Sequence, residues 1–565
     1  MSTPSRPYAA LAGVTAAAVA IGTAEPVAVL TGPRSAPLVA VGGVVVDAVP
    51  ESLKQLAIDV FGTADKIALL VGTALLLGAF AALIGVLAVR RLAIGLAGIA
   101  LFAAVGVAAA LTRAGADAAD ALPSLVGGGF GAVVLWAFTV GPLELAPWPW
   151  SSPLPPSALH EEASGPGRAA PDTGRPISGA APQEAEDPSR PSHPTAGPVA
   201  APETAVDGTD PESRRRFLTG AGALLGTATV AGLGGRWLAG RRGVSAAREA
   251  IRLPAPVAPA PAVPAGADLS LTQVAPYVTS NFGFYRIDTA LVVPQVDPDT
   301  WRLRIHGRVG TERTYSYADL LARPLVERYV TLACVSNEVG GDLIGNARWL
   351  GVPIRELLDE VEPEADADQV VGRSVDGWTC GTPTAALRDG RDALLAVGMN
   401  GEPLPVEHGF PVRMVVPGLY GYVSACKWIT ELELTRFSDF DAYWVPRGWS
   451  AQGPIKTQSR IDAPRPRNRL TGGPVTVAGV AWAQHRGIRR VEVRVDEGPW
   501  QEATLAPAVS VDTWVQWSWR WNATPGEHKL QVRATDATGE IQIERRQAVA
   551  PDGATGWHTV TVTVR

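Results

Sequence analysis

A cysteine followed by polar residues is the first place in this chain where chemistry could occur. The run Tyr329-Val-Thr-Leu-Ala-Cys334-Val-Ser-Asn337 has the pattern of a strand that ends at the cysteine. A thiolate is a soft, strongly donating ligand that suits a transition metal. A cysteine at a strand end is more often a small buried residue, so this run alone leaves both interpretations open.

Three basic residues flank a glycine-containing turn further along the chain. His408, Arg413 and Lys427 lie in the run His408-Gly-Phe-Pro-Val-Arg413-Met-Val-Val-Pro-Gly418-Leu-Tyr-Gly421-Tyr-Val-Ser-Ala-Cys-Lys427-Trp428. Glycines let backbone N–H groups approach an anion, and Arg and Lys supply charge to a phosphate. The run therefore suggests an anion site, with a solvated strand edge as the alternative.

In their order along the chain, these motifs resemble the sulfite oxidase family of molybdenum enzymes. The matching positions are Thr331, Leu332, Cys334, Asn346, Trp349, Gly351, Val352, His408–Arg413 and Lys427-Trp428. Upstream, Phe284-Tyr285-Arg286-Ile287-Asp288 occupies the place of the family's Phe-Phe-x-Arg-Asn segment. The resemblance covers roughly residues 275–565, about half of the chain.

The resemblance implies a role for each matching side chain. Cys334 would be the single protein ligand of molybdenum, beside two dithiolene sulfurs of the pterin, and Arg286 would face the metal and attract an oxyanion. His408 and Arg413 would hold the pterin and its phosphate. The other residues implied to contact the cofactor are Phe284, Tyr285, Asp288, Asp376, Ala425, Cys426 and Lys427.

The chain departs from the family at two positions of the implied pocket. Sulfite-oxidising members place a Tyr near the metal in a segment that aligns with Tyr443–Trp449, and here Pro446 takes that position. Ile287 replaces the Asn that follows the family's Arg. Both differences put sulfite itself in doubt as the substrate.

Composition limits the class of protein and its cysteine chemistry. The 565 residues include 49 Lys and Arg against 55 Asp and Glu, a formal net charge of −6, which argues against a nucleic-acid-binding protein with its basic stripe. Three cysteines without a CxxC motif do not form a disulfide framework. We expect Cys380 and Cys426 to be unpaired and partly buried, with a disulfide between them as the alternative.

Residues 1–146 are expected to form a helical membrane bundle, since 47% of the whole chain is hydrophobic and only 18% is charged. A membrane crossing needs ~20 apolar residues. Three segments meet this length, Ile67–Val89, Leu92–Leu111 and Leu122–Leu143, while Ala9–Leu30 is a weaker candidate and Leu38–Val46 is short enough to be interfacial or re-entrant. Arg90 and Arg91 indicate a cytoplasmic loop, which would place the amino terminus in the cytoplasm too.

The next segments suggest a linker and an export signal. Residues 147–212 are rich in Pro, Ser and Ala and are expected to be disordered. Residues 213–243 begin with Ser213-Arg214-Arg215-Arg216-Phe217-Leu218 and continue as an apolar stretch, which resembles a twin-arginine signal; a stop-transfer flank is the alternative. Residues 244–267 contain a Pro/Ala-rich run, expected to be an extended spacer that holds the globular part off the membrane.

The remaining chain is expected to contain two domains. Residues 268–455 would form the α+β sulfite-oxidase-like molybdopterin domain, with strands at Tyr329–Leu332 and Val412–Val416 and helices at Tyr317–Leu321 and Ile354–Val361. Residues 456–565 would form an Ig-like β-sandwich. Its expected strands are Val475–Val480, Arg489–Val495, Trp514–Trp521, His528–Ala534 and His558–Val564. This sandwich resembles the family's dimerisation domain, which implies a homodimer.

The leading interpretation is an extracytoplasmic molybdenum-cofactor oxidoreductase, anchored in the cell membrane by several spans. It would act on a small sulfur or other oxyanion and exchange electrons with a separate carrier. We expect no haem, because no His precedes His160 and Met1 is the only Met before it. The alternatives are a methionine sulfoxide reductase with the same centre, a non-catalytic tethered envelope binding protein and, with less support, a transporter regulated by the outer domain.

Overall fold

The structure is a computed structural model that describes residues 6–48, 65–113, 116–143, 211–241 and 243–565. The expected linker, residues 147–212, lies outside the described residues except for its last two positions. The chain divides into two compact units. One contains Met1–Ala20, Leu76–Leu101 and Gly128–Val230, and the other contains Ile21–Leu75, Phe102–Gly127 and Ala231–Arg565.

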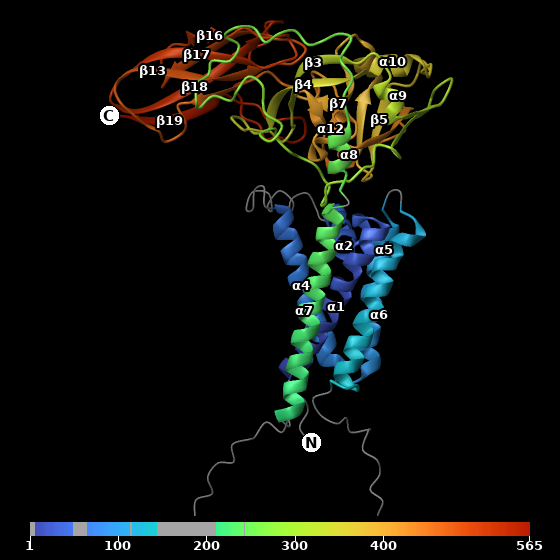
Figure 1. The fold of residues 1–565 in the computed structure, drawn as a ribbon. Coiled ribbons are helices and arrows are strands. Elements are labelled where there is room, and N and C mark those ends of the chain that lie inside the picture. The colour runs from blue at the N-terminus through green and yellow to red at the C-terminus, as the bar shows by residue number, and fades with distance from the viewer. Residues whose placement is uncertain (1–5, 49–64, 114–115, 144–210, 242) are drawn as a thin grey trace, which may run out of the picture. The chain divides into compact units, whose positions relative to one another are not determined.

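Long apolar helices make up the first part of the chain (Figure 1). They are α1 (Arg6–Thr31), α4 (Asp65–Ala88), α5 (Leu92–Leu111), α6 (Leu122–Thr139) and α7 (Pro211–Arg241). Within the described ranges, five helices are long and apolar enough to cross a membrane, and the segment Arg6–Thr31 is one of them. The short α2 (Pro37–Ala48) is not, in keeping with its expected length, and α6 ends before Leu143.

Small residues let helices approach closely in the first unit. A Cβ at Gly13 of α1 would overlap the backbone of α4 at Ala81, so these two helices touch through their main chains. Phe217, from the twin-arginine-like motif, is buried, with its ring centroid 4.7 Å from that of Phe138 and 5.6 Å from that of Tyr8. The motif therefore contributes to helix packing, and its use as an export signal stays a prediction.

The Pro/Ala-rich run is packed against the globular fold. Val244, next to the short helix α8 (Ser245–Ala250), is buried in a hydrophobic cluster. Val257 N donates to Leu325 O at 2.8 Å, and Glu327 N donates to Ala258 O at 2.9 Å. The extended run is therefore not detached from the globular part, because it supplies hydrogen bonds to the beginning of β3 (Val326–Ala333), an edge strand. Its role as a spacer that holds the globular part off the membrane stays a prediction.

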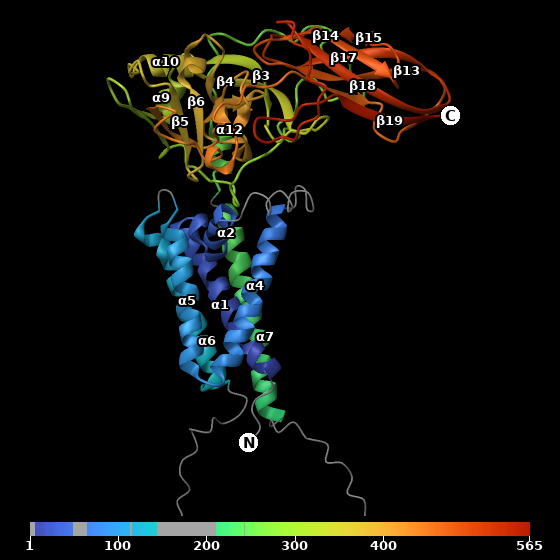
Figure 2. The same cartoon turned by 180° about the vertical axis from the view of Figure 1, so that it is seen from behind.

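Two sheets form the α+β domain (Figure 2). The first has the order β3-β4-β7-β8, with β9 paired to β7, and is antiparallel. The second has the order β2-β1-β10-β5-β6, in which β1 and β10 run parallel. Their bounds are β4 (Ile344–Pro353), β7 (Leu394–Met399), β8 (Glu402–Pro403), β9 (Arg413–Val415), β2 (Arg313–Ser316), β1 (Arg302–Gly307), β10 (Ile429–Thr435), β5 (Gln369–Ser374) and β6 (Thr379–Pro383).

Short helices connect these strands: α9 (Tyr317–Leu321), α10 (Ile354–Asp359), α11 (Thr384–Arg388) and α12 (Gly421–Ser424). The expected helices at Tyr317–Leu321 and Ile354–Val361 are confirmed as α9 and α10. Ser316 and Asp319 form a capping box that satisfies backbone N–H groups at the start of α9. The two strands expected in this domain correspond to β3 and β9.

The C-terminal domain consists of two packed sheets. Their orders are β11-β13-β17-β16 and β12-β19-β18-β14-β15. The bounds are β11 (Gln458–Ala463), β13 (Gly473–Trp482), β17 (Val515–Ala523), β16 (Thr504–Leu505), β12 (Arg469–Leu470), β19 (His558–Val564), β18 (Gly526–Asp536), β14 (Ile488–Val495) and β15 (Gln501–Glu502). Val477 and Trp517 of one sheet share a buried cluster with Val491 and Val532 of the other, which confirms the β-sandwich.

The sandwich also packs against the α+β domain. Trp482 and Trp514 of the sandwich belong to the same buried cluster as Leu350 and Val412 of the other domain. The side-chain amide of Gln484 donates to Thr331 O at 3.0 Å, in the middle of β3. The strand that ends at Cys334 is therefore supported by both domains.

Candidate functional site

Cys334 lies directly after β3, at the base of a short loop. Its N–H donates to Leu343 O at 2.9 Å, and its carbonyl accepts from Asn337 N at 3.2 Å. The residue is partly accessible, whereas Ala333 and Val335 are buried. Burial raises the pKa of the Cys334 thiol, while hydrogen bonds from Ser336 and the charge of Lys427 oppose this rise. A metal ion that bound this thiol would displace its proton.

A chain of charges links three residues of the predicted site. Lys427 Nζ lies 2.8 Å from Asp288 Oδ2, and Arg286 Nε lies 3.0 Å from the same oxygen. Asp288 and Lys427 are buried, but the side chain of Arg286 is 40% exposed. Arg286 can therefore offer its other N–H groups to an anion that arrives from solvent.

Arg413 is a buried guanidinium whose hydrogen-bond acceptors are neutral main-chain oxygens. Its Nη1 donates to His408 O at 3.1 Å, its Nη2 lies 3.5 Å from Ala425 O, and its Cζ lies 5.1 Å from the centre of the Trp349 ring. In the part of the chain that the structure describes, no carboxylate forms an ion pair with it. Burial lowers the pKa of Arg413 to about 10, so its positive charge is held at a cost that an anionic ligand would offset.

His408 ends the short 3-10 helix Val406–His408 and is held in place by a hydrogen bond and an aromatic cluster. Its Nε2 lies 2.9 Å from Asn281 O, which assigns the ring N–H to Nε2. Phe284 packs edge-on against both His408 and Trp349, with ring centroids 5.6 and 5.7 Å away. Burial lowers the pKa of His408 to about 4, so the ring is neutral near pH 7 and acts as a hydrogen-bonding group there.

Two glycines bring the backbone close to these side chains. Gly409 has φ +110°, and a Cβ there would lie 3.0 Å from Arg413 Cβ and 3.1 Å from Lys427 Cβ, so only glycine fits without displacement. A Cβ at Gly421 would lie 4.0 Å from the hydroxyl of Tyr285 and 3.8 Å from Ala333 O. The Tyr285 hydroxyl is therefore beside the end of β3, and burial raises its pKa.

The remaining predicted contacts lie next to this group. Ala425 and Cys426 precede Lys427, and Cys426 O accepts from Met414 N at 2.9 Å. Asp376 lies in the turn between β5 and β6, where its carboxylate accepts from Trp378 N at 3.2 Å. The structure connects Asp376 to the group only indirectly, through the electrostatic effect of its charge on the pKa of Cys426.

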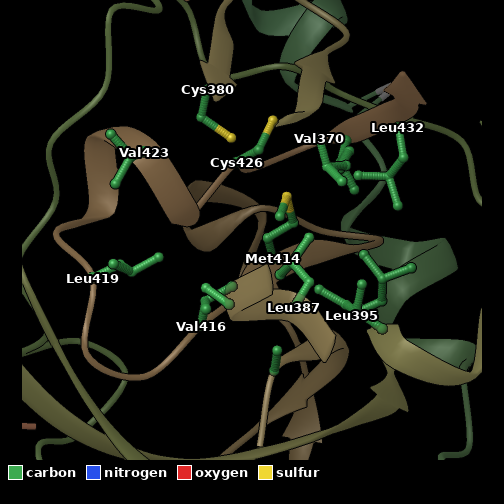
Figure 3. Packing of buried hydrophobic residues seen from close by; sticks show 14 of the residues in the cluster. Val370, Cys380, Leu387, Leu395, Met414, Val416, Leu419, Val423, Cys426 and Leu432 are labelled. Atoms are coloured by element: carbon green, nitrogen blue, oxygen red, sulfur yellow. The ribbon is translucent and has the colours of Figure 1, made fainter. Parts of the chain in front are cut away.

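Cys380 and Cys426 are unpaired, as expected, but they are fully rather than partly buried. Figure 3 shows their sulfurs in the hydrophobic packing that includes Met414 and Val370. A Cβ at Gly372, on the strand next to Cys380, would lie 3.0 Å from Cys380 Sγ and 3.3 Å from Cys426 Cβ. Gly372 pairs directly with Cys380, and its lack of a side chain leaves room for the two cysteine side chains, which are both closed to water.

The segment Tyr443–Trp449, which is expected to replace the family's Tyr, forms a compact aromatic turn. Arg447 lies over the ring of Tyr443, with Cζ 3.8 Å from its centre, and donates to Tyr443 O. Trp444 packs against Tyr443 and Trp449. Pro446 lies within the short helix Val445–Arg447, and its correspondence to the family's Tyr stays a prediction.

Sequence reasoning missed three contributors to the site. Asn281 provides the acceptor for His408, Ser336 hydrogen-bonds the Cys334 thiol, and Trp349 covers the Arg413 guanidinium. Trp349 belonged to the motif that carried the family resemblance, but its contact with Arg413 was not predicted. Ser336 could have been found from its position two residues after the cysteine, whereas Asn281 depends on a contact across 127 residues.

These residues fit a molybdenum–pterin cofactor by their chemistry. One accessible thiol supplies a soft metal ligand, and buried Arg413 and Lys427 supply positive charge for a phosphate. Arg413 makes its hydrogen bonds only to main-chain oxygens, which leaves its charge without a counter-ion in the described part of the chain. An anionic group in this position would supply one.

Comparison with known proteins points to the same family. Residues 290–444 match the family model described as "Oxidoreductase molybdopterin binding domain", and residues 458–562 match "Bacterial Ig domain". The uncharacterized oxidoreductase YuiH of Bacillus subtilis is 30% identical over 181 residues, which are 32% of this chain and 88% of that protein. The chain belongs to the sulfite oxidase family of molybdopterin-dependent oxidoreductases, whose cofactor is molybdenum bound to molybdopterin.

Two further relatives carry functional names. Mitochondrial sulfite oxidase of Rattus norvegicus is 31% identical over 347 residues, 51% of this chain and 62% of that enzyme, so the match spans less than two thirds of the sulfite oxidase. The catalytic subunit MsrP of the protein-methionine-sulfoxide reductase of Burkholderia mallei is 32% identical over 265 residues, 43% of this chain and 73% of that protein. Among solved structures, the sulfane dehydrogenase SoxCD of Paracoccus pantotrophus is 24% identical with a TM-score of 0.45, covering 51% of this chain and 81% of that one.

Proposed function

We propose that this chain is a membrane-anchored molybdenum oxidoreductase that acts on a small sulfur oxyanion or sulfoxide and exchanges electrons with a separate carrier. The observation that carries the proposal is the single accessible thiol of Cys334, on which the charge of buried Lys427 acts, with buried Arg413 in turn next to Lys427. When bound, the cofactor supplies two-electron, oxygen-atom transfer chemistry.

The residues of this chain would bind the cofactor and orient the substrate. Cys334 holds the metal, and Arg413 and Lys427 bind the phosphate of the pterin, with Gly409 allowing the close approach of the backbone. Neutral His408 offers Nδ1 as an acceptor to the pterin, because Nε2 is used by Asn281 O. Arg286 draws the oxyanion towards the metal, since it is partly exposed and Asp288 fixes its Nε.

The apolar helices would anchor the enzyme, with the catalytic part outside the cell membrane. Five candidate spans among the described residues, an odd number, would put the amino terminus and the catalytic part on opposite sides. Arg214, Arg215 and Arg216 at the start of α7 support export by a twin-arginine route, which carries folded, cofactor-loaded proteins. A reporter fused to the carboxyl end and active only outside the cytoplasm would test this orientation.

A methionine sulfoxide reductase is the second candidate. It is favoured by the replacement at Pro446 and by the match to MsrP, which covers a larger share of that protein than the match to sulfite oxidase does. The two candidates differ in the direction of electron flow. Steady-state assays with sulfite and an electron acceptor, and with methionine sulfoxide and an electron donor, would separate them.

The decisive experiment is metal analysis of the full chain from a host that makes the cofactor. We expect nearly one molybdenum per chain in the wild type and almost none in Cys334→Ser. Cys380→Ser is the matched control, because it also removes one sulfur from the same domain but should leave the metal content unchanged. A wild-type protein without molybdenum, or a Cys334→Ser variant that keeps it, would contradict the proposal.

A further inference from the structure

The loop that follows Cys334 is attached to the C-terminal domain at its far end. Within the loop, Leu343 N donates to the side-chain oxygen of Asn337 at 2.9 Å, and Gly341 N donates to Glu338 O at 2.8 Å. These bonds, with the Cys334–Leu343 bond at the base, make the loop a closed unit. A displacement of its far end would therefore be transmitted to Cys334 and Ser336.

Two residues of the C-terminal domain make the attachment. Arg460, on β11, donates through Nη1 to Gly341 O at 2.6 Å, while its Nε is paired with Asp462. His558, at the start of β19, packs directly on Gly340, where a Cβ would overlap the imidazole ring. The ring is fixed in turn because Ile461 N donates to its Nδ1 at 2.9 Å.

The same domain supports the strand before the cysteine. Thr331 N donates to Asp512 O at 2.9 Å, and Trp514 N donates to Thr331 Oγ1 at 2.8 Å. Together with the bond from Gln484 to Thr331 O, these contacts hold the last residues of β3 along the edge that does not pair with β4. The strand before Cys334 and the loop after it are thus both held by residues more than a hundred positions further along the chain.

We propose that Arg460 and His558 are positioning residues for the metal ligand: by holding the Gly340–Gly341 end of the loop, the C-terminal domain sets the orientation and exposure of the Cys334 thiol. This role is distinct from any part the domain plays in dimerisation. Since the reacting centre of the proposed function is bound through Cys334, the inference deepens that function and rests on it for its catalytic meaning.

The test compares two glycine substitutions of equal backbone cost. Gly340 has φ +85° and faces His558, whereas Gly266 has φ +81° and would place a Cβ in open space. Both Gly340→Ala and Gly266→Ala impose the same left-handed conformation on alanine, but only the first pushes the loop away from β19. Any difference between the two variants therefore reports on the contact with His558.

The first measurement is the alkylation rate of Cys334 in the cofactor-free full chain with iodoacetamide, read by peptide mass spectrometry. Buried Cys380 and Cys426 serve as internal references for intact folding. We expect Gly340→Ala to raise the Cys334 rate about fivefold or more, because thiol reactivity follows exposure, and Gly266→Ala to stay within about twofold of the wild type. Equal rates in the two variants would overturn the inference.

The second measurement uses the cofactor-loaded protein. A displaced thiolate should shift the sulfur-to-molybdenum charge-transfer absorption in Gly340→Ala but not in Gly266→Ala. If Gly340→Ala does not accumulate, Arg460→Lys takes its place, because an ammonium group does not reproduce the rigid planar fork with which the guanidinium reaches Asp462 and Gly341 O in fixed directions. An Arg460→Lys protein with wild-type alkylation and absorption would overturn the inference. Failure of the wild type to bind molybdenum would instead contradict the proposed function, and the alkylation comparison would still decide the positioning role.

Discussion

Lys427 Nζ and Asp288 Oδ2 lie 2.8 Å apart in a buried ion pair, although 139 positions separate the two residues. Burial lowers the pKa of Lys427 to about 8, and the negative charge of Asp288 opposes this decrease. The carboxylate therefore keeps the ammonium group charged near neutral pH. It does so at the position where the phosphate of the cofactor is proposed to bind.

Replacing Asp288 with Asn should narrow the pH range in which the protein holds its cofactor. Without the carboxylate the pKa of Lys427 falls further, and since a lysine is charged only below its pKa, the ammonium group is lost at a lower pH. We expect cofactor-free wild type to take up cofactor less well above about pH 8, and Asp288→Asn to lose uptake at a lower pH. Molybdenum content after loading across pH 6.5–9 measures this.

Lys427→Arg is the control for that experiment. A guanidinium stays charged over the whole range, so its uptake should depend least on pH. A profile for Asp288→Asn that coincides with the wild-type profile would show that the ion pair does not control the charge at Lys427.

Arg413→Met should separate stability from cofactor binding. The buried guanidinium has only neutral acceptors, so its replacement by an apolar side chain removes a desolvation cost, an effect that is often neutral or stabilising by about 1–4 kcal/mol. We expect the cofactor-free variant to unfold in urea at the same or a higher midpoint than the wild type. Its molybdenum content should nevertheless be close to zero.

Arg486→Met provides the contrast. Arg486 Nε lies 2.8 Å from Asp536 Oδ2, whose side chain is fully buried. Removing the arginine leaves that carboxylate without its cation, which costs about 3–5 kcal/mol, so this variant should unfold earlier. If Arg413→Met lost as much stability as Arg486→Met, the description of Arg413 as a buried cation without a counter-ion in the cofactor-free protein would be wrong.

The separate elements of the site could be predicted from the sequence, but their connections could not. The strand before Cys334 follows from its run of β-branched and apolar residues, and the resemblance supplied Arg413 and Lys427. The pair Lys427–Asp288 and the contact of His558 with Gly340 join positions far apart in the chain. A single sequence contains no local signal for such pairs, because side-chain spacing predicts only neighbours along a helix or strand.

The Pro/Ala-rich run keeps the extended backbone that its prolines favour, and tertiary contacts make use of it. Proline at Pro254 and Pro256 favours an extended backbone, and this preference led to the expectation of an extended spacer. The run is also used for pairing, because the edge of β3 has unpaired backbone groups, and Val257 N and Ala258 O bond to Leu325 O and Glu327 N there. An extended segment without internal hydrogen bonds is well suited to pair with such an edge.

Two buried histidines should make the protein less stable in mild acid. Burial lowers the pKa of both His408 and His558 to about 4. Between their ordinary pKa of about 6.5 and 4, the unfolded chain binds protons that the folded chain does not, so stability falls as the pH decreases through this window. The free energy of unfolding measured in urea at pH 7, 6 and 5 should decrease accordingly.

His558→Gln and His528→Gln distinguish the contribution of one ring. The first substitution removes a histidine whose folded pKa is lowered to about 4, so the decrease between pH 7 and 5 should become smaller by up to about 2 kcal/mol. His528 pairs with Asp496 at 3.0 Å, and this pair raises its pKa, so His528→Gln should not reduce the decrease. An unchanged pH dependence in His558→Gln would contradict the assignment of its neutral state.

The three thiols should differ sharply in reactivity and in their contribution to stability. Cys380 and Cys426 are fully buried within the packing of Figure 3, whereas Cys334 is partly accessible. In the native, cofactor-free chain we expect only Cys334 to react with an alkylating reagent on the scale of minutes. Cys380→Ala and Cys426→Ala should each lower the free energy of unfolding by roughly 1–2 kcal/mol, because each leaves a cavity, and Cys334→Ala should lower it less. A Cys380 that reacted as fast as Cys334, while the chain stayed folded by circular dichroism, would mean that the strands around it open far more readily than their packing implies.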